Sequence, residues 1–446
     1  MTQDTIVAIS TPPGRGGIGI VRLSGPDAQR IVAPMLRLRH PLAAGHARFG
    51  TLLDAAGGTL DEIVATLFAA PHAYTGEDVL EIAAHGAPVI LEAIVQQCIA
   101  AGARLANPGE FTERAFLSGR IDLTQAEAVR DLIDAQTLHQ ARVAAQQMEG
   151  ALGRRIQPVK QALIELIAAL EAGIDFAEDD IDVMTATVIA EKLAAVTAPL
   201  TQLAASFAYG RIVRDGLVLA IVGLPNAGKS SLFNRLIERE RAIVTAAPGT
   251  TRDLVSERVS IGGIPVDLVD TAGLRESSDE AETLGVAKTR EAMADADIVL
   301  LVRDASQQQL HETALLNSIT GRKHLLVANK KDLVMTTGGI FHPGELMVSA
   351  LTGDGIPRLR ELILELAAGS AQQADTAMLT NLRQRQAIES ALEGLTRAHA
   401  AVAAGVPHEM LLLDVYAALR GLDTLTGATT ADDVLNLIFS TFCIGK

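Results

Sequence analysis

Residues 223–230, with the sequence GLPNAGKS, constrain the fold of this chain more than any other segment. They match the pattern G-x-x-x-x-G-K-[ST], and they lie between an apolar run, residues 217–222, and a segment of helical character. Glycines in such a turn let backbone N–H groups approach an anion, and the lysine neutralises the charge of that anion. The serine hydroxyl can bind Mg²⁺. The order of strand, turn and helix therefore predicts a phosphate-binding loop with Lys229 and Ser230 in these two roles.

A second motif follows another predicted strand. Residues 270–273, DTAG, come directly after the apolar run 264–269, so Asp270 is expected at the carboxyl end of a strand. An aspartate in that position can hold Mg²⁺ through water, and the N–H group of Gly273 can sense a γ-phosphate. This motif predicts that the bound molecule is a nucleoside triphosphate.

A third motif selects the base. Residues 329–332, NKKD, follow the apolar run 324–328. The carboxylate of Asp332 can accept both N–H groups on the Watson–Crick edge of guanine, and adenine lacks that pair of donors. Asn329 is expected to brace the loop, and residues 349–350 to offer a backbone N–H group to guanine O6. These ordered signals predict a Ras-like GTPase domain; an ATPase with a coincidental NKxD motif is the weaker alternative.

The sequence leaves open which group activates water. Ras-type enzymes carry a glutamine directly after the DTAG glycine, whereas this chain has Leu274, which cannot hydrogen-bond water. Residues 242–253, which close with GTTRD, are expected to form a switch loop whose Thr250 or Thr251 reaches Mg²⁺. The candidates for positioning water or stabilising charge are Glu276, Asp279, Glu280, Glu282, Arg252 and Arg275.

Composition excludes several other classes of protein. A net charge of −15 argues against broad nonspecific binding of nucleic acid. We expect no membrane span, since no apolar run approaches ~20 residues, and a cytoplasmic location, since the N-terminal segment does not resemble a secretion signal. The two cysteines, Cys98 and Cys443, are too few for a disulfide framework or a cysteine-rich zinc site. Cys98 falls on the apolar stripe of a predicted helix at 88–101, which indicates a core residue.

The length predicts about three domains. The predicted fold class is multidomain α+β and α/β. Residues 1–118 mix short strands, glycine-rich turns and a helix, and residues 119–212 are helical. Residues 216–370 form the GTPase block with a mixed, mainly parallel sheet, and residues 377–446 are helical again. We expect the two helical segments to pack together, with the GTPase domain inserted between them, because neither has another partner for its apolar stripe.

Both ends of the chain carry unusual residues. Residues 11–22, TPPGRGGIGIVR, are rich in glycine, which suggests close approach of the backbone to a ligand or is an ordinary turn. The chain stops at 442–446, FCIGK. A cysteine there fits prenylation poorly, because Gly445 and Lys446 follow it. An idle exposed thiol and a nucleophile assisted by Lys446 both remain open.

The motifs together resemble the family of bacterial tRNA-modification GTPases called MnmE or TrmE. The resemblance covers essentially the whole chain, and its most specific parts are TPPGRGGIGIVRLSG, YTGEDVLE, PGEFTERAF, GLPNAGKSSLFN, GTTRD, DTAGLR and FCIGK. It implies an N-terminal domain that binds tetrahydrofolate and dimerises, a split helical domain and an inserted Ras-like domain. It also implies a homodimer with nucleotide-dependent contact between GTPase domains, and an FAD-dependent partner, MnmG (GidA). The pair adds an aminomethyl or carboxymethylaminomethyl group to C5 of the wobble uridine of certain tRNAs.

The resemblance also implies roles for single residues. Glu282 takes the place of the missing glutamine, and Cys443 is needed for the modification. Arg22, Glu81, Arg120 and Lys446 are expected around 5-formyl- or 5,10-methylene-tetrahydrofolate. A bound K⁺ replaces an arginine finger, and its expected ligands are Asn226, Thr245, Ala247 and Thr250. The expected Mg²⁺ ligands are Ser230, Thr251 and Asp270. The expected GTP-binding residues are Asn226, Ala227, Gly228, Lys229, Ser230, Ser231, Thr245, Thr250, Thr251, Asp270, Thr271, Ala272, Gly273, Asn329, Lys330, Asp332, Ser349 and Ala350.

Two other functions compete with this hypothesis. A ribosome-assembly GTPase of the Era or Der type shares the phosphate-binding loop and the switch pattern, but it needs a KH module or a second GTPase domain. A folate-binding regulatory switch would use GTP turnover only as a signal. The terminal FCIGK favours a modification enzyme over a switch, because a switch has no evident use for a thiol at that position.

Overall fold

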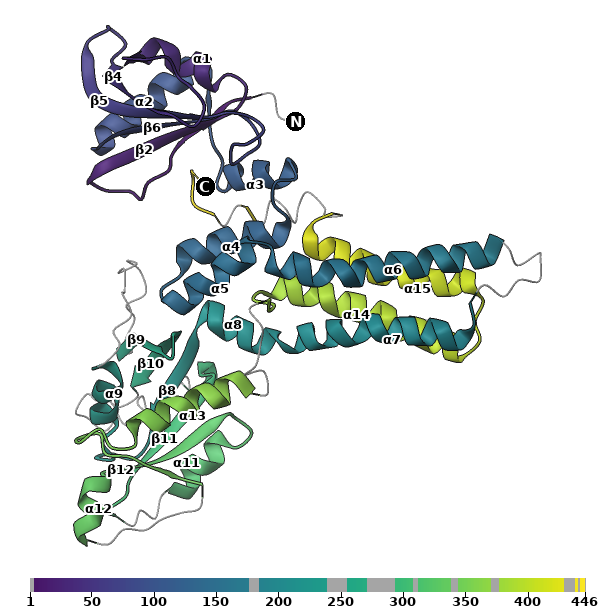
Figure 1. Cartoon of the computed structure of the whole chain (residues 1–446). Coiled ribbons are helices and arrows are strands. Elements are labelled where there is room, and N and C mark those ends of the chain that lie inside the picture. The colour runs from purple at the N-terminus through teal and green to yellow at the C-terminus, as the bar shows by residue number, and fades with distance from the viewer. Residues whose placement is uncertain are drawn as a thin grey trace. The chain divides into compact units, whose positions relative to one another are not determined.

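A computed structural model describes residues 4–175, 184–238, 255–270, 293–307, 312–337, 344–369, 377–428, 438–439 and 442–445 (Figure 1). The chain forms two compact units. The first contains residues 1–130 together with 423–446, and the second contains residues 131–422. The C-terminal segment is therefore part of the same unit as the N-terminal segment.

The first unit is built on a seven-stranded sheet with the order β3-β4-β5-β6-β2-β1-β7. Its neighbours are antiparallel, except that β1 and β7 are parallel. The strands are β1 (Ile6–Ile9), β2 (Gly16–Ser24), β3 (Leu36–Leu38), β4 (Ala47–Leu53), β5 (Thr59–Phe68), β6 (Val79–Gly86) and β7 (Arg104–Leu105). The helices of the same part of the chain are α1 (Ala28–Val32), η1 (Ala33–Met35), α2 (Pro88–Ala100) and α3 (Glu110–Leu117).

Helix α2 packs on the sheet of the first unit and closes its core. The helix predicted at 88–101 is confirmed, and its buried residues include Leu91, Ile94 and Cys98. The packing is tight, because a Cβ atom at Gly19 of β2 would lie 2.5 Å from a methyl carbon of Leu91. Burial raises the pKa of the Cys98 thiol to about 12. Cys98 is thus a core residue, as its place on the apolar stripe indicates.

Long helices make up much of the second unit (Figure 1). Helices α7 and α14 pack against each other, and Tyr416 of α15 donates a hydrogen bond of 2.6 Å to Glu171 of α6. Segments on both sides of the second sheet in the sequence therefore pack together, as the apolar stripes predict. The helices are α5 (Leu138–Met148), α6 (Ala151–Asp175), α7 (Ala186–Ala205), α8 (Phe207–Asp215), α14 (Leu382–Ala403) and α15 (His408–Thr426); α4 (Leu123–Asp134) precedes them.

A six-stranded sheet with the order β13-β12-β11-β8-β10-β9 also belongs to the second unit. Only β9 and β10 are antiparallel, so five strands point the same way and their carboxyl ends meet at one edge. The strands are β8 (Leu217–Val222), β9 (Val255–Ile261), β10 (Ile264–Asp270), β11 (Ile298–Asp304), β12 (His324–Asn329) and β13 (Leu346–Met347). The accompanying helices are α9 (Lys229–Ile237), α11 (Glu312–Ile319), α12 (Lys331–Thr337) and α13 (Ile356–Ala368).

Helix α8 leads directly into the second sheet. Gly216, with φ 93°, is the one residue between α8 and β8. The other end of α8 packs against the segment before α14, because Ser206 accepts a hydrogen bond of 3.2 Å from the N–H group of Leu379. None of the helices in the described parts of the chain is long and apolar enough to cross a membrane.

Candidate nucleotide and tail sites

The phosphate-binding loop predicted at 223–230 joins β8 to α9. Two of its glycines have positive φ angles, 155° at Gly223 and 86° at Gly228. Both lie against other backbone or side-chain atoms, since a Cβ atom would collide with the carbonyl oxygen of Val302 at Gly223 and with the amide of Asn329 at Gly228. The turn therefore requires glycine at these two positions, for conformation and for space.

Backbone conformation singles out two other residues of this edge. Among the described residues, Asn226 and Lys330 are the non-glycine residues with positive φ, at 65° and 64°. Such conformations cost free energy in an ordinary turn and concentrate at functional sites. Both residues are predicted to bind nucleotide, and they come from two different strand ends, after β8 and after β12.

Lys229 begins α9 and is buried against the loop itself. Its ammonium group donates hydrogen bonds of 2.9 and 3.0 Å to the carbonyl oxygens of Gly223 and Leu224. Ser230 and Ser231 follow in the first turn of α9 and are exposed. Backbone N–H groups at a helix N-terminus and a lysine at its first position form an arrangement that binds phosphate.

Asn329 connects three loops at the carboxyl edge of the sheet. Its side-chain N–H₂ donates to the carbonyl oxygen of Ala227 at 3.1 Å, and its side-chain oxygen accepts from the N–H group of Ala350 at 3.0 Å. Asp332 is close by, because its carboxylate accepts a hydrogen bond of 2.5 Å from the Ser349 hydroxyl. The structure thus brings together the predicted phosphate-binding and guanine-binding segments.

Asp270 and Ser230 carry side-chain oxygens on neighbouring elements. Asp270 ends β10 and is 4% exposed, and it is the register partner of Ile221 in β8, the strand that leads to the loop carrying Ser230. Carboxylate and hydroxyl oxygens are ligands that Mg²⁺ prefers, usually together with water and phosphate oxygens. The donor set therefore fits Mg²⁺ bound beside a nucleotide.

Several predicted site residues lie outside the described parts of the chain. They are Thr245, Ala247, Thr250, Thr251, Thr271, Ala272, Gly273, Glu282 and Lys446, together with the further candidates for hydrolysis Arg252, Arg275, Glu276, Asp279 and Glu280. Their roles remain predictions from the sequence.

The first unit brings the C-terminal segment to two predicted folate residues. Arg22 of β2 pairs with Glu81 of β6 across 2.7 Å, and each side chain is about a quarter exposed. The Arg22 guanidinium also donates to the carbonyl oxygen of Gly445 at 3.4 Å and lies 5.7 Å from the ring centre of Phe111. A partly exposed guanidinium beside a carboxylate offers both a cation and a hydrogen-bond acceptor to a ligand.

Two residues that the sequence did not indicate also hold this segment. The Ser10 hydroxyl donates to the carbonyl oxygen of Gly445 at 3.1 Å, and the N–H group of Gly109 donates to that of Cys443 at 3.4 Å. Phe442 is buried, whereas Cys443 is exposed. The backbone of the tail is therefore fixed while the thiol faces solvent.

Arg120 makes a different contact from the other predicted folate residues. Its guanidinium donates a hydrogen bond of 2.8 Å to the carbonyl oxygen of Pro71. No contact among the described residues joins Arg120 to Arg22 or Glu81. Its predicted role near folate therefore depends on the resemblance alone.

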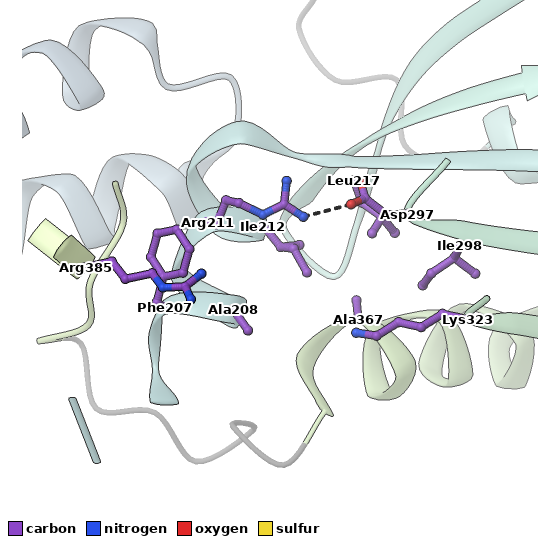
Figure 2. A pocket seen from close by; sticks show the side chains of 10 residues that line it. All are labelled: Phe207, Ala208, Arg211, Ile212, Leu217, Asp297, Ile298, Lys323, Ala367 and Arg385. Atoms are coloured by element: carbon purple, nitrogen blue, oxygen red, sulfur yellow. Dashed lines mark hydrogen bonds and ion pairs between the residues drawn. The ribbon is translucent and has the colours of Figure 1, made fainter. Parts of the chain in front are cut away.

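A cavity of about 270 Å³ lies at the edge of the second sheet that is opposite the phosphate-binding loop (Figure 2). Its lining includes Leu217 and Ile298, at the amino ends of β8 and β11, whereas the phosphate-binding loop follows the carboxyl end of β8. Arg211 points across the cavity to Asp297, with 2.8 Å between the bonded atoms. Asp297 also accepts a hydrogen bond of 3.0 Å from the N–H group of Val218. This cluster connects α8 to the base of the sheet and is separate from the nucleotide site.

Sequence comparison identifies related proteins along the full chain. Residues 5–120 match the family model described as GTP-binding protein TrmE N-terminus, and residues 123–443 match the one described as MnmE helical domain. The protein named tRNA modification GTPase MnmE from Koribacter versatilis is 57% identical over 452 residues, covering 100% of this chain and 99% of that protein. The protein of the same name from Aquifex aeolicus is 42% identical over 448 residues, covering 100% of both chains.

Solved structures also match part of the chain. The G domain of the T. maritima FeoB iron transporter is 29% identical and covers 34% of this chain and 98% of that chain, with a TM-score of 0.27. Aquifex aeolicus Era is 25% identical and covers 40% of this chain and 66% of that chain, with a TM-score of 0.28. Because these TM-scores are low, the structural matches carry no argument, and the family assignment rests on the full-length sequence matches. The chain belongs to the family of the tRNA modification GTPase MnmE.

Proposed function

We propose that this protein is a K⁺-stimulated GTP hydrolase that modifies the wobble uridine of certain tRNAs. With the FAD-dependent partner MnmG, it would add an aminomethyl or carboxymethylaminomethyl group to C5, taking one carbon from a tetrahydrofolate. The observation that carries the proposal is that one chain combines a sheet edge with the predicted phosphate-binding and guanine-binding segments and a C-terminal segment that carries the exposed Cys443 and binds Arg22 through the carbonyl oxygen of Gly445. We place the protein in the cytoplasm, where GTP and tRNA are available.

GTP binding follows from the groups at the carboxyl edge of the second sheet. Lys229 and the first N–H groups of α9 would bind the phosphates, and Asp332 would accept the guanine N–H groups. Ser230, Thr251 and Asp270 would hold Mg²⁺, which neutralises charge on the phosphates. The positive φ of Asn226 and its exposed side chain agree with this part of the loop facing a ligand.

Hydrolysis requires a positioned water molecule and compensation of negative charge. We assign the first task to Glu282, because Leu274 stands where Ras-type enzymes have glutamine. Asn226, Thr245, Ala247 and Thr250 would hold K⁺, which supplies positive charge where other GTPases use an arginine finger. Contact between two GTPase domains would hold the loop at 242–253, which carries Thr245, Ala247 and Thr250, in place around the ion.

The modification chemistry belongs to the first unit in this proposal. Arg22, Glu81, Arg120 and Lys446 would hold 5-formyl- or 5,10-methylene-tetrahydrofolate. The Cys443 thiolate would add to C6 of uridine, which makes C5 nucleophilic toward the one-carbon unit. C5 would then bond to the methylene carbon of 5,10-methylene-tetrahydrofolate as the bond from that carbon to N10 breaks and N10 takes a proton. Loss of the proton from C5 would afterwards expel the thiolate and restore the C5–C6 double bond. The exposure of Cys443 supports this role, because a buried thiol could not reach a base.

The open face of the sheet in the first unit supports a homodimer. Phe49, Val64 and Phe68 are 42%, 38% and 39% exposed, and Phe49 and Val64 are register partners on β4 and β5. Apolar side chains gathered on one face of a sheet favour burial against another surface. We propose that a second copy of this unit covers the face.

The two alternative functions, a ribosome-assembly GTPase and a folate-binding switch, are not equally compatible with the sequence matches. The full-length match to MnmE relatives disfavours a ribosome-assembly GTPase of the Era or Der type. A folate-binding switch differs from the proposal in one testable respect, because it would not change the base. Cys443 therefore distinguishes the two.

Reconstitution tests the proposed function. The full chain is incubated with MnmG, unmodified tRNA, GTP, 5,10-methylene-tetrahydrofolate and glycine, the amine that supplies the nitrogen of the product, once in KCl and once in NaCl, and nucleosides are analysed by mass spectrometry. We expect a C5-modified wobble uridine and fast GTP turnover only in KCl. Equal turnover in both salts would contradict the K⁺ assignment, and an unchanged uridine with fast turnover in KCl would contradict the modification.

A further inference from the structure

Asp304 is a buried carboxylate at the carboxyl edge of the second sheet, which we call the nucleotide edge because the phosphate-binding loop and the NKKD segment lie there. None of the predicted roles uses Asp304. It ends β11, and 1% of its surface is exposed. Its register partner in β12 is Asn329, the first residue of the NKKD segment. A carboxylate is costly to bury unless positive or hydrogen-bonding groups surround it. The partners of Asp304 therefore indicate what it does.

Both carboxylate oxygens of Asp304 are occupied. One oxygen lies 2.7 Å from the ammonium group of Lys330, and the other accepts hydrogen bonds of 2.9 and 2.6 Å from the backbone N–H group and hydroxyl of Ser306. Burial alone would raise the pKa of Asp304, but the bonds from Lys330 and Ser306 outweigh burial and hold this pKa below its ordinary value. Asp304 is therefore a fixed anion at neutral pH.

Lys330 is held in an unusual way by this contact. Its φ of 64° belongs to the left-handed region, so the backbone alone does not favour its position. The Cε atom of its side chain lies 3.9 Å from where a Cβ atom of Gly228 would be, which places the lysine stem beside the phosphate-binding loop. The ion pair with Asp304 fixes the far end of that stem.

We propose that Asp304 is a positioning residue for guanine nucleotide binding. It holds the side chain of Lys330 against the phosphate-binding loop before a nucleotide binds. The inference rests on the proposed GTP site and adds a residue to it. A lysine side chain loses considerable conformational entropy when it is fixed, and Asp304 fixes it before the nucleotide arrives. A nucleotide can then bind without the entropic cost of ordering the Lys330 side chain.

The test is the dissociation of fluorescently labelled GDP from the full chain, with steady-state GTP hydrolysis measured in parallel. In Asp304→Asn the side chain keeps its size, but an N–H₂ group replaces one carboxylate oxygen. The single remaining oxygen cannot accept hydrogen bonds from both Lys330 and Ser306, which bind different oxygens of Asp304. We expect GDP to dissociate about tenfold faster, since a charge-assisted hydrogen bond is lost. The kcat of GTP hydrolysis at saturating GTP should change less than about twofold, because no group that contacts the transferred phosphate is altered.

Two further variants separate positioning from a general structural role. Lys330→Ala should raise the GDP dissociation rate by a similar factor, and the double variant should be no worse than either single one, because both remove the same interaction. Asp297→Asn is the matched control. Asp297 directly precedes the amino end of β11 and accepts a hydrogen bond from Arg211 (Figure 2). It also accepts one from the backbone N–H group of Val218. Its GDP dissociation rate should equal that of the wild type.

The outcomes distinguish this inference from the GTP site itself. Unchanged GDP dissociation in Asp304→Asn, or effects of Asp304→Asn and Lys330→Ala that add in the double variant, would overturn the positioning role. Equal acceleration in Asp297→Asn would also overturn it, because the effect would then come from damage to β11. Failure of the wild-type protein to bind GDP would instead contradict the proposed GTP site.

Discussion

At the scale of single residues, the nucleotide edge depends on contacts that few side chains can make. Gly228 leaves space for the amide of Asn329, and that amide binds the carbonyl oxygen of Ala227. Asn329 also holds Ala350, so one side chain fixes the relative position of three loops. Such preorganisation favours ligand binding, because less order has to be created when the nucleotide arrives.

Lys229 is expected to be essential for nucleotide binding. Removal of its ammonium group in Lys229→Ala leaves the phosphate charge without its main protein partner, so GTP binding should weaken by about 100-fold or more. Fluorescence titration with labelled GTP measures this change. The matched control is Lys192→Ala, which alters an exposed lysine of α7 and should bind as the wild type does. Persistent affinity in Lys229→Ala would remove this residue from the site.

Glu282 is expected to act on hydrolysis and not on binding. Glu282→Ala should bind GTP as the wild type does, and its single-turnover hydrolysis should fall by about 100-fold, since a positioned group that orients or activates water contributes on this order. Rapid-quench measurement with radiolabelled GTP tests the expectation. Glu191→Ala, at an exposed position of α7, is the control. Hydrolysis at the wild-type rate in Glu282→Ala would mean that another group positions water.

At the scale of elements, apolar runs and caps made much of the fold predictable. Strands β8, β10 and β12 lie where predominantly apolar runs, broken in β10 by Asp267, precede polar motifs, because strands buried on both faces have this pattern. The start of α4 was also predictable, since Asp122 and Gln125 satisfy each other's backbone N–H groups at 2.9 Å. These features are local, so a single segment of sequence carries them.

The less predictable contacts join distant parts of the chain. Ser10 and Gly445 are 435 residues apart, and no local pattern indicates their hydrogen bond. The pairing of Asp304 with Lys330 spans 26 residues, but it had a weak signal, because Asp304 ends an apolar strand as Asp270 does. Side-chain pairing depends on strand order, and strand order is not a property of one segment.

The tail is expected to need glycine at position 445. Gly445 has φ 95°, and a Cβ atom there would collide with the carbonyl oxygen of Ile9. Gly445→Ala should therefore displace the tail and reduce tRNA modification by about tenfold or more, with GTP turnover unchanged. Nucleoside mass spectrometry and phosphate release measure the two activities. Ile444→Ala changes a side chain that is 51% exposed and should modify tRNA normally. Normal modification by Gly445→Ala would contradict the need for a fixed tail.

At the scale of the whole molecule, the groups proposed for nucleotide binding and for base modification lie in two different compact units. The nucleotide edge belongs to the second unit, and the tail with Cys443, Arg22 and Glu81 belongs to the first. Helix α8 joins the helices of the second unit to the base of its sheet through Gly216 and the pair of Arg211 and Asp297. We therefore propose that GTP hydrolysis and base modification are separable chemistries within one chain.

The most direct test of that separation uses Cys443→Ser. Transfer RNA from cells that carry the wild-type or the variant protein is analysed for modified nucleosides by mass spectrometry, and GTP turnover is measured on both purified proteins. We predict that the C5-modified wobble uridine disappears while GTP hydrolysis persists, because the thiol is proposed to act on the base and the predicted nucleotide site lies in the other unit. Survival of the modification in Cys443→Ser would contradict the proposed role of Cys443, since the thiol would then take no part in the chemistry.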